Sequence, residues 1–247
     1  MNKICLISQP AGIGDIFVCQ KIAKTIQAMT EYKTILWPVW PIYSYLSDYL
    51  IGEDIHFFDD SESFEHKEIY LSNRKEIIQT ENLLYLPLQT SNYVMKSCKC
   101  HQNPYAQCAM KYNFCNIEHE DWASYFEFKR DFQRENKLFE ALNLDLSVPY
   151  NLINNNYGTF PHFASRHDLI PQNNYKNVYM NFYEGTTLFD WIKVFENAYE
   201  IHTMATSVPF ILEKLKLDRV VIYSRYHGEE LQCARTFYNK NWKYELK

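Results

Sequence analysis

The first forty residues alternate between apolar runs and polar loops in the order expected of an α/β unit. Residues 3–8 form a short apolar, β-branched run, which predicts a buried strand. A loop at 9–15 follows, and apolar residues then recur at helical spacing, which predicts a helix over 15–29. Residues 33–38 return to the strand pattern. This order is typical of the start of a doubly wound α/β domain.

The same two patterns recur along the rest of the chain. Before residue 150 they predict helices over 41–50 and 122–143 and strands at 56–58, 68–72 and 83–87. The apolar face expected for 122–143 consists of Phe126, Phe132, Leu138, Phe139 and Leu142. After Pro149 they predict strands at 150–153, 177–182, 200–204 and 220–223, and helices over 188–198 and 206–215.

The doubled pattern predicts an α/β protein with two Rossmann-like domains that face a central cleft. We expect a first domain over 1–146, with a cysteine- and aromatic-rich insertion at 88–135, and a second domain over 147–247. No internal repeat of fixed period accompanies this doubled theme.

Composition narrows the class of protein. The net charge is −5, from 25 basic and 30 acidic residues, and no basic stripe is present, which argues against nucleic acid as a partner. No stretch approaches the ~20 apolar residues of a membrane span, and the apolar start is too short for a signal peptide. Seven cysteines, an odd number, are expected to be reduced thiols. We therefore expect a cytoplasmic protein.

Glycine is scarce, with only 6 residues, yet Gly12 and Gly14 stand one residue apart where the first strand meets the first helix. Glycines at such a turn let the backbone bend sharply and let a ligand approach the helix N-terminus. The dinucleotide-binding pattern requires a third glycine where Phe17 stands, and the P-loop triplet is absent from the sequence. Asp15 is then either a helix-capping acid or a functional carboxylate.

The segment Pro10-Ala-Gly-Ile-Gly-Asp-Ile-Phe-Val18 resembles the N-terminal signature of heptosyltransferase-like glycosyltransferases of the GT-B fold (the ADP-heptose:LPS heptosyltransferase superfamily). The resemblance implies that Asp15 is the general base that deprotonates an acceptor sugar hydroxyl. It also implies that Gly12, Ile13 and Gly14 shape the acceptor-side loop.

A second, looser stretch is similar to the donor half of the same fold. It includes the Gly185-Thr-Thr turn and the segment 198–207, which ends in Thr206 and Ser207 at the start of a predicted helix. The resemblance implies that Thr206 and Ser207 bind the diphosphate of a nucleotide-sugar donor, while ordinary helix capping is the alternative for both, with Ser207 as the N-cap residue. Ala205 stands where the family usually carries an acid, which puts a heptose donor in doubt.

Three further residues are candidates for the donor site. Arg225 follows the last predicted strand, where a cation can offset the charge of a leaving diphosphate. Glu213 is a candidate for contacting a donor ribose or sugar, and His202 for contacting donor or acceptor; an exposed helix glutamate and a structural histidine are the alternatives. An Asp-x-Asp motif is absent from the sequence, so we expect no metal and no cofactor besides the nucleotide-sugar co-substrate.

Four cysteines and two histidines within the insertion present zinc-binding residue types: Cys98, Cys100, His101, Cys108, Cys115 and His119. The first pair is separated by a single residue, which is not the usual spacing of a structural zinc site. Free thiols are the favoured interpretation, while a zinc site and a disulfide stay open.

The sequence thus predicts an inverting, metal-independent glycosyltransferase acting on a nucleotide-sugar donor and a glycan acceptor. The alternative is a non-catalytic nucleotide- or carbohydrate-binding module with the same cleft. The short chain and its Asn, Tyr and Lys bias are typical of a viral or phage enzyme.

Overall fold

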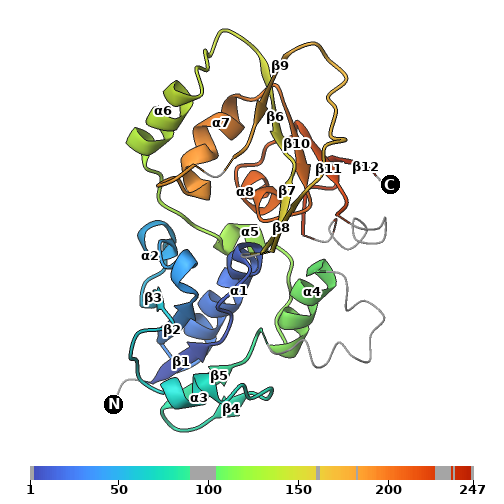
Figure 1. Cartoon of the computed structure of the whole chain (residues 1–247). Helices are drawn as coiled ribbons and strands as arrows, with labels where there is room; N and C mark the ends of the chain where they lie inside the picture. Colours follow the sequence, from blue (N-terminus) through green and yellow to red (C-terminus); the bar gives the residue numbers. More distant parts are fainter. Residues whose placement is uncertain are drawn as a thin grey trace. The chain divides into compact units, whose positions relative to one another are not determined.

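A computed structural model describes residues 3–89, 104–159, 162–181, 183–225, 235 and 237–245. The chain divides into two compact units, Met1–Lys129 and Arg130–Lys247. Each unit contains its own five-stranded sheet (Figure 1). Both are α/β units built mainly from parallel strands, as the hydrophobic pattern predicts.

The first unit is a sheet in the order β3-β2-β1-β5-β4, in which only β4 is antiparallel to its neighbour. Its elements are β1 (Ile4–Ile7), α1 (Ile13–Met29), β2 (Thr34–Val39), η1 (Pro41–Tyr43), α2 (Leu46–Tyr49), β3 (Ile55–Asp59), α3 (Lys67–Leu71), β4 (Ile78–Gln79), β5 (Leu83–Leu86), α4 (Pro104–Phe114) and α5 (Trp122–Tyr125). The chain runs outward from β1 to β3 and then returns to the other side of β1. The carboxyl ends of β1 and β5 therefore form a topological switch point, where open α/β sheets bind ligands.

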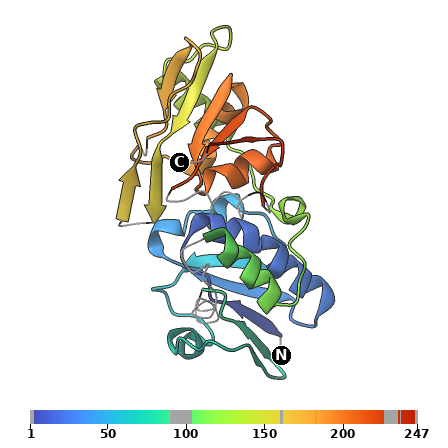
Figure 2. The same ribbon diagram turned by 90° about the vertical axis from the view of Figure 1, so that its right-hand side faces the viewer.

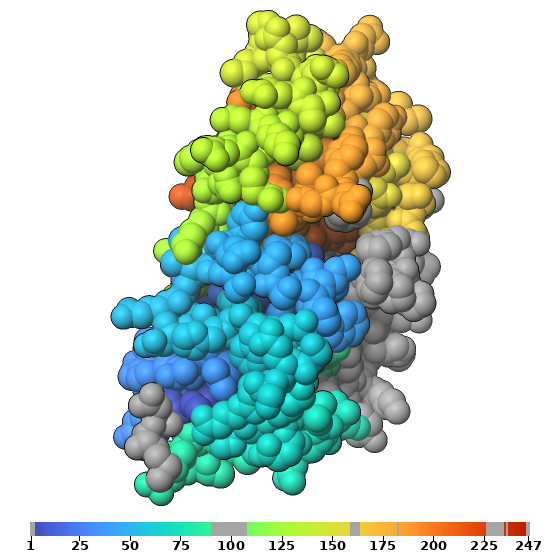
Figure 3. Space-filling view, turned by 60° about the vertical axis from the view of Figure 1, so that its left-hand side comes forward, coloured from blue at the N-terminus to red at the C-terminus, as the bar shows by residue number. Residues whose placement is uncertain are grey.

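Helices α1 and α4 lie side by side on one face of this sheet (Figure 2). Helix α1 also packs on α5, where Phe17 stacks on Phe126 with ring centroids 4.5 Å apart. The opposite face has a smaller cluster around Leu6, Tyr70 and Tyr85. Residues around α3 and β4, coloured cyan to teal, form a continuous part of the surface of this unit (Figure 3).

The second unit is a parallel sheet in the order β12-β11-β10-β6-β9. Its elements are α6 (Phe132–Ala141), β6 (Tyr150–Asn154), β7 (Asn156–Thr159), β8 (His162–Ser165), β9 (Lys176–Tyr179), η3 (Leu188–Trp191), α7 (Ile192–Asn197), β10 (Glu200–Met204), α8 (Val208–Lys214), β11 (Val220–Tyr223) and β12 (Lys243–Glu245). The chain passes from β6 to β9 and then returns to the other side of β6. The switch point of this sheet therefore lies at the carboxyl ends of β6 and β10.

Ion pairs hold α6 in the second unit. Arg130 pairs with the buried Glu135 and also with Glu196 on α7. Arg134 pairs with the buried Asp190 of η3, at 2.8 Å. These contacts place α6 with the sheet that follows it in the chain. The predicted domain boundary at residue 146 would instead separate α6 from that sheet, and it stays a prediction.

Three sequence predictions before residue 150 differ from the structure, and the helix expected over 188–198 also divides, into η3 and α7. Residues 67–71 form a helix, α3, where a strand over 68–72 is expected. Five residues are too few for periodicity to separate helix from strand, and one helical turn buries Tyr70. The segment 41–50 divides into η1 and α2.

The predicted helix over 122–143 is the third difference, because it is two helices. Between α5 and α6, Phe128 forms a β-bridge with Leu50. Asp131 then caps α6, because its carboxylate accepts hydrogen bonds from the amides of Gln133 and Arg134. Phe132, expected on the apolar face, is 63% exposed. No helix in the described ranges is long and apolar enough to span a membrane.

Candidate functional site

The loop after β1 is fixed by its neighbours at the switch point of the first sheet. The Ser8 amide donates to the Leu86 carbonyl, and the Gln89 amide donates to the Ser8 carbonyl, both across to the end of β5. On the other side, the Trp37 indole donates to the Gln9 carbonyl at 3.1 Å. The loop that leads into α1 is therefore held between β2 and β5.

Gly12 begins α1 in a conformation that favours glycine. Its φ is +80°, in the left-handed region, and its carbonyl accepts the first helical hydrogen bond, from Ile16. A Cβ atom here would lie 2.6 Å from Oδ2 of Asp15. Ile13 and Gly14 form the first turn. The turn thus brings the Asp15 carboxylate back against the loop.

Asp15 is held by a residue that the sequence does not single out. Lys111 on α4 forms an ion pair with Oδ1 of Asp15, and the Cys108 thiol lies 3.6 Å from the same oxygen. Lys111 is buried at 3% exposure, whereas the Asp15 side chain is 25% exposed. Burial has the largest effect on the pKa of Lys111 and acts to lower it, but the charge and hydrogen bond of Asp15, together with Cys19 and Cys108, outweigh burial and the pKa is raised. The ammonium is therefore charged, and part of the Asp15 side chain faces solvent.

The surroundings of this pair are apolar or neutral. The Tyr112 hydroxyl donates to the Val18 carbonyl at 2.5 Å and ties α4 to α1. Cys19 and Cys108 are buried, and desolvation raises the pKa of both thiols, to about 12 for Cys19. Both thiols are therefore neutral beside the ion pair at physiological pH.

A sequence signal for Lys111 exists, although it lies in the cysteine-rich insertion. Cys108, Lys111, Tyr112 and Cys115 are spaced i, i+3, i+4 and i+7, which is one face of a helix. A lysine within such a stripe is buried only when it is paired. The stripe is identifiable from the sequence, but its partner on α1 is not.

The cysteines that the structure describes are packed thiols. Cys5, Cys19 and Cys108 are buried, Cys115 is half-buried, and all four are free. Among the described residues, no group of three His, Cys, Asp or Glu side chains is arranged to hold a metal ion. Cys98, Cys100 and His101 lie outside the described residues, so the zinc alternative stays open for them.

A second polar cluster lies at the switch point of the other sheet. Asn154 at the end of β6 donates from Nδ2 to the Thr203 hydroxyl at 2.9 Å and to the Thr206 hydroxyl at 3.2 Å. Thr206 also accepts a bond from the Val208 amide at 3.4 Å. Ser207 occupies the N-cap position of α8, but its side chain makes no capping bond. The predicted N-cap position of Ser207 is thus confirmed, but the hydroxyl that accepts from the start of α8 is that of Thr206.

Arg225 lies at the carboxyl end of the neighbouring strand, β11, and is half-buried. The sequence missed a second arginine at this edge. Arg166, beyond β8, donates to the Ser224 carbonyl at 2.6 Å and binds both oxygens of Asp168. Both arginines lie at the carboxyl edge of β11, and the contacts of Arg166 hold it to Ser224 and Asp168.

Three predicted donor contacts have other roles in the fold. His202 is buried in β10, and its ring nitrogens contact the Tyr223 hydroxyl at 2.9 Å and Glu200 at 2.7 Å. Glu213 lies in the last turn of α8, about 10 Å along the helix axis from Thr206. Burial raises the pKa of Glu213.

The third is Gly185, which has a φ of +74° and accepts a bond from Arg134 through its carbonyl, at 2.5 Å. Its carbonyl anchors α6, and its left-handed turn leads toward η3. Glu213 differs from His202 and Gly185, because its Oε2 is buried without a hydrogen-bond partner among the described residues. The donor roles of all three stay predictions, and the proposed donor site does not include them.

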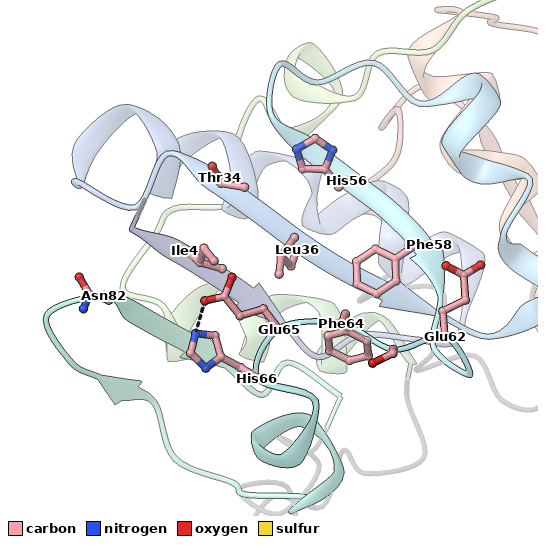
Figure 4. A pocket seen from close by; sticks show the side chains of 11 residues that line it. Ile4, Thr34, Leu36, His56, Phe58, Glu62, Phe64, Glu65, His66 and Asn82 are labelled. Atoms are coloured by element: carbon pink, nitrogen blue, oxygen red, sulfur yellow. Dashed lines mark ion pairs between the residues drawn. The ribbon is translucent and has the colours of Figure 1, made fainter. Parts of the chain in front are cut away.

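A groove of about 810 Å³ lies on the sheet face of the first unit opposite α1 (Figure 4). Ile4, Leu36 and Phe58 contribute to its floor, and Glu65 and His66, which form an ion pair, lie at its edge. None of the site residues predicted from the sequence lines it. It lies on the sheet face and not at the switch point, so it is separate from the Asp15 site.

Comparisons with known proteins give little beyond this geometry. No known protein-family profile and no curated protein matches the chain. Among solved structures, the chain is similar to the one described as the crystal structure of the glycosyl transferase family 9 from Veillonella parvula DSM 2008. The TM-score is 0.47 and the identity 8%, over 90% of this chain and 80% of that chain. A likeness at this level cannot assign an activity, which has to come from the residues of the site.

Proposed function

We propose that the protein is an inverting, metal-independent glycosyltransferase that transfers a sugar from a nucleotide-diphosphate sugar to a glycan hydroxyl. The observation that carries the proposal is the placement of one polar cluster at the switch point of each sheet. Asp15 follows β1 in the first unit, and Asn154 and Thr206 follow β6 and β10 in the second. Open α/β sheets bind their ligands at such points.

Asp15 is the proposed general base. Its carboxylate takes the proton of the acceptor hydroxyl as the hydroxyl oxygen attacks the anomeric carbon of the donor. A new carbon–oxygen bond forms, and the bond from the anomeric carbon to the diphosphate breaks. The electron pair of that bond leaves with the nucleoside diphosphate, and attack from the opposite side inverts the anomeric centre. The 25% exposure of Asp15 supports this role.

The second unit is the proposed donor side. Thr206, Ser207 and Arg225 lie at the carboxyl ends of two adjacent strands, β10 and β11, and would bind the diphosphate. Hydroxyl groups donate to phosphate oxygens, and an arginine balances the charge of the leaving group. The absence of an Asp-x-Asp motif from the sequence supports a reaction in which side chains take the place of a metal. The cytoplasmic location and the viral or phage origin stay predictions.

The test begins with binding and proceeds to turnover. UDP-, GDP- and ADP-linked sugars are screened by thermal shift, and each binder is assayed for release of the nucleoside diphosphate with and without glycan acceptors. We expect one nucleotide class to stabilise the fold and to be turned over. Binding without release would instead favour the non-catalytic binding module.

The Asp15→Asn variant tests the base. Loss of the base should reduce kcat by about 100-fold or more, while the donor Kd stays within a factor of two. Full transfer activity in this variant would refute the assignment. Activity that EDTA abolishes and Mg²⁺ or Mn²⁺ restores would refute the metal-independent mechanism.

A further inference from the structure

Lys111 forms an ion pair with Oδ1 of the Asp15 carboxylate. We propose that Lys111 is a positioning residue, which fixes Oδ1 of Asp15 so that Oδ2, beside Gly12, is the oxygen that takes the acceptor proton. This inference rests on the proposed function. Its structural basis is the ion pair at Oδ1, the Cys108 thiol 3.6 Å from the same oxygen, and the location of Oδ2 against Gly12.

Packing alone does not require a lysine at this position. Lys111 lies in the buried stripe of α4 between Cys108, Tyr112 and Cys115, where an unbranched apolar side chain such as Met would fill a similar volume. Burying an ion pair is costly, and replacing such a pair by apolar residues is often neutral for stability. A buried lysine whose partner is a quarter exposed therefore indicates a role at the carboxylate.

The groups around the Lys111–Asp15 ion pair favour a single position of the ammonium. The groups that act on the Lys111 ammonium are Asp15 and Cys19 on α1 and Cys108 on α4. Both thiols are buried and neutral, so of these three groups only Asp15 attracts the ammonium as an anion. The Tyr112 hydroxyl, bonded to the Val18 carbonyl, holds α4 against α1 and so fixes the approach of Lys111.

The test is a double-mutant cycle on the full-length protein, with Lys111→Met, Asp15→Asn and the double variant. Release of the nucleoside diphosphate from the donor identified by the screen is measured in the presence of acceptor. We expect Lys111→Met to lower kcat by about 30-fold with an unchanged donor KM, and by less than about twofold in the Asp15→Asn background. Lys24→Met is the matched control, because it makes the same change at a lysine of α1 that forms an ion pair with Glu127 and not with Asp15, and it should keep kcat within about twofold of the wild type.

Urea unfolding of the same four proteins provides a readout that does not need turnover. Each single change leaves one member of the pair without its partner, so we expect the double variant to be more stable than the sum of the two single losses predicts. If the loss of unfolding free energy in the double variant equals the sum of the two single losses, the energetic coupling between Lys111 and Asp15 is overturned.

The kinetic outcomes separate this inference from the function on which it rests. If Asp15→Asn is inactive while Lys111→Met keeps the wild-type kcat, the positioning role is overturned and the proposed function stands. If Lys111→Met and Lys24→Met lose equal activity, Lys111 is only structural. If the wild type turns over no nucleotide sugar, the proposed function fails and this inference fails with it.

Discussion

Gly12 leaves the space that the Asp15 carboxylate occupies, because a Cβ atom at position 12 would lie 2.6 Å from Oδ2 of Asp15. The backbone of Gly12 is also left-handed, with a φ of +80°. Two separate requirements therefore fall on one glycine. The first concerns the backbone conformation and is general to such turns, whereas the second concerns the position of the Asp15 side chain.

Gly12→Ala should therefore be more costly than an alanine at another left-handed glycine. Gly185 has a φ of +74° and no atom within 4 Å of an added Cβ, so Gly185→Ala measures the conformational cost alone, about 1 kcal/mol. Gly12→Ala adds the collision with Asp15, and we expect a loss of about 2–3 kcal/mol. Urea unfolding of both variants checks the difference. Equal losses would show that the carboxylate moves aside without cost.

The capping of α8 distinguishes two neighbouring hydroxyl residues. Thr206 accepts from the Val208 amide and from Asn154, whereas Ser207 makes no capping bond. We expect Thr206→Ala to lower the free energy of unfolding by about 1–2 kcal/mol, and Ser207→Ala to change it by less than about 0.5 kcal/mol. Thermal and urea unfolding measure both. A larger loss of stability for Ser207→Ala than for Thr206→Ala would show that the Ser207 hydroxyl caps α8.

The buried Asp190 should contribute a pH-dependent part of the stability. Burial acts to raise the pKa of Asp190, but hydrogen bonds from Arg134 and the Thr187 amide outweigh it and hold the pKa below its ordinary value of 3.8. A carboxyl whose pKa is lower in the folded state stabilises the protein above its unfolded pKa. That contribution is then lost as the pH falls below about 4.

Asp190→Asn should remove this dependence. We expect the variant to be about 2 kcal/mol less stable at pH 7 and to lose less stability than the wild type between pH 5 and pH 3, a range of about two units around the ordinary carboxyl pKa. Asp48→Asn, at an exposed position, is the control and should follow the wild type. Identical pH profiles for the wild type and Asp190→Asn would contradict the prediction.

The described thiols should resist modification in the folded protein. Burial raises the pKa of Cys19 and Cys115 to about 12, and it also raises the pKa of Cys5 and Cys108. Since the thiolate is the reactive form, these cysteines should react slowly at pH 8. A variant with serine at positions 98, 100 and 233 retains only these four thiols.

We expect Ellman's reagent to label this variant slowly in buffer and to label all four thiols rapidly in guanidinium chloride. Fast labelling of the folded variant would show that α4 separates readily from α1. The same measurement on Tyr112→Phe tests whether the hydroxyl bond to Val18 restrains that opening.

Local sequence patterns account for most strands of both sheets. The strands predicted at 150–153, 200–204 and 220–223 match β6, β10 and β11 closely. The clearest of the three is β11, because a continuous apolar run identifies a strand buried on both faces. The edge strands β4 and β12 were missed because they have two and three residues and little burial. The strand expected at 68–72 was wrong because so short a run carries no periodicity.

The sequence by itself determined that a glycine turn presents Asp15 at the start of the first helix, since that depends only on residues adjacent in the chain. Tertiary structure alone decided which residue faces Asp15. Lys111 is 96 positions away and reaches Oδ1 only because α4 packs against α1. It decided likewise that Thr206 rather than Ser207 caps α8 and meets Asn154. Spacing along one element fixes which side chains share a face, but packing between elements fixes which faces meet.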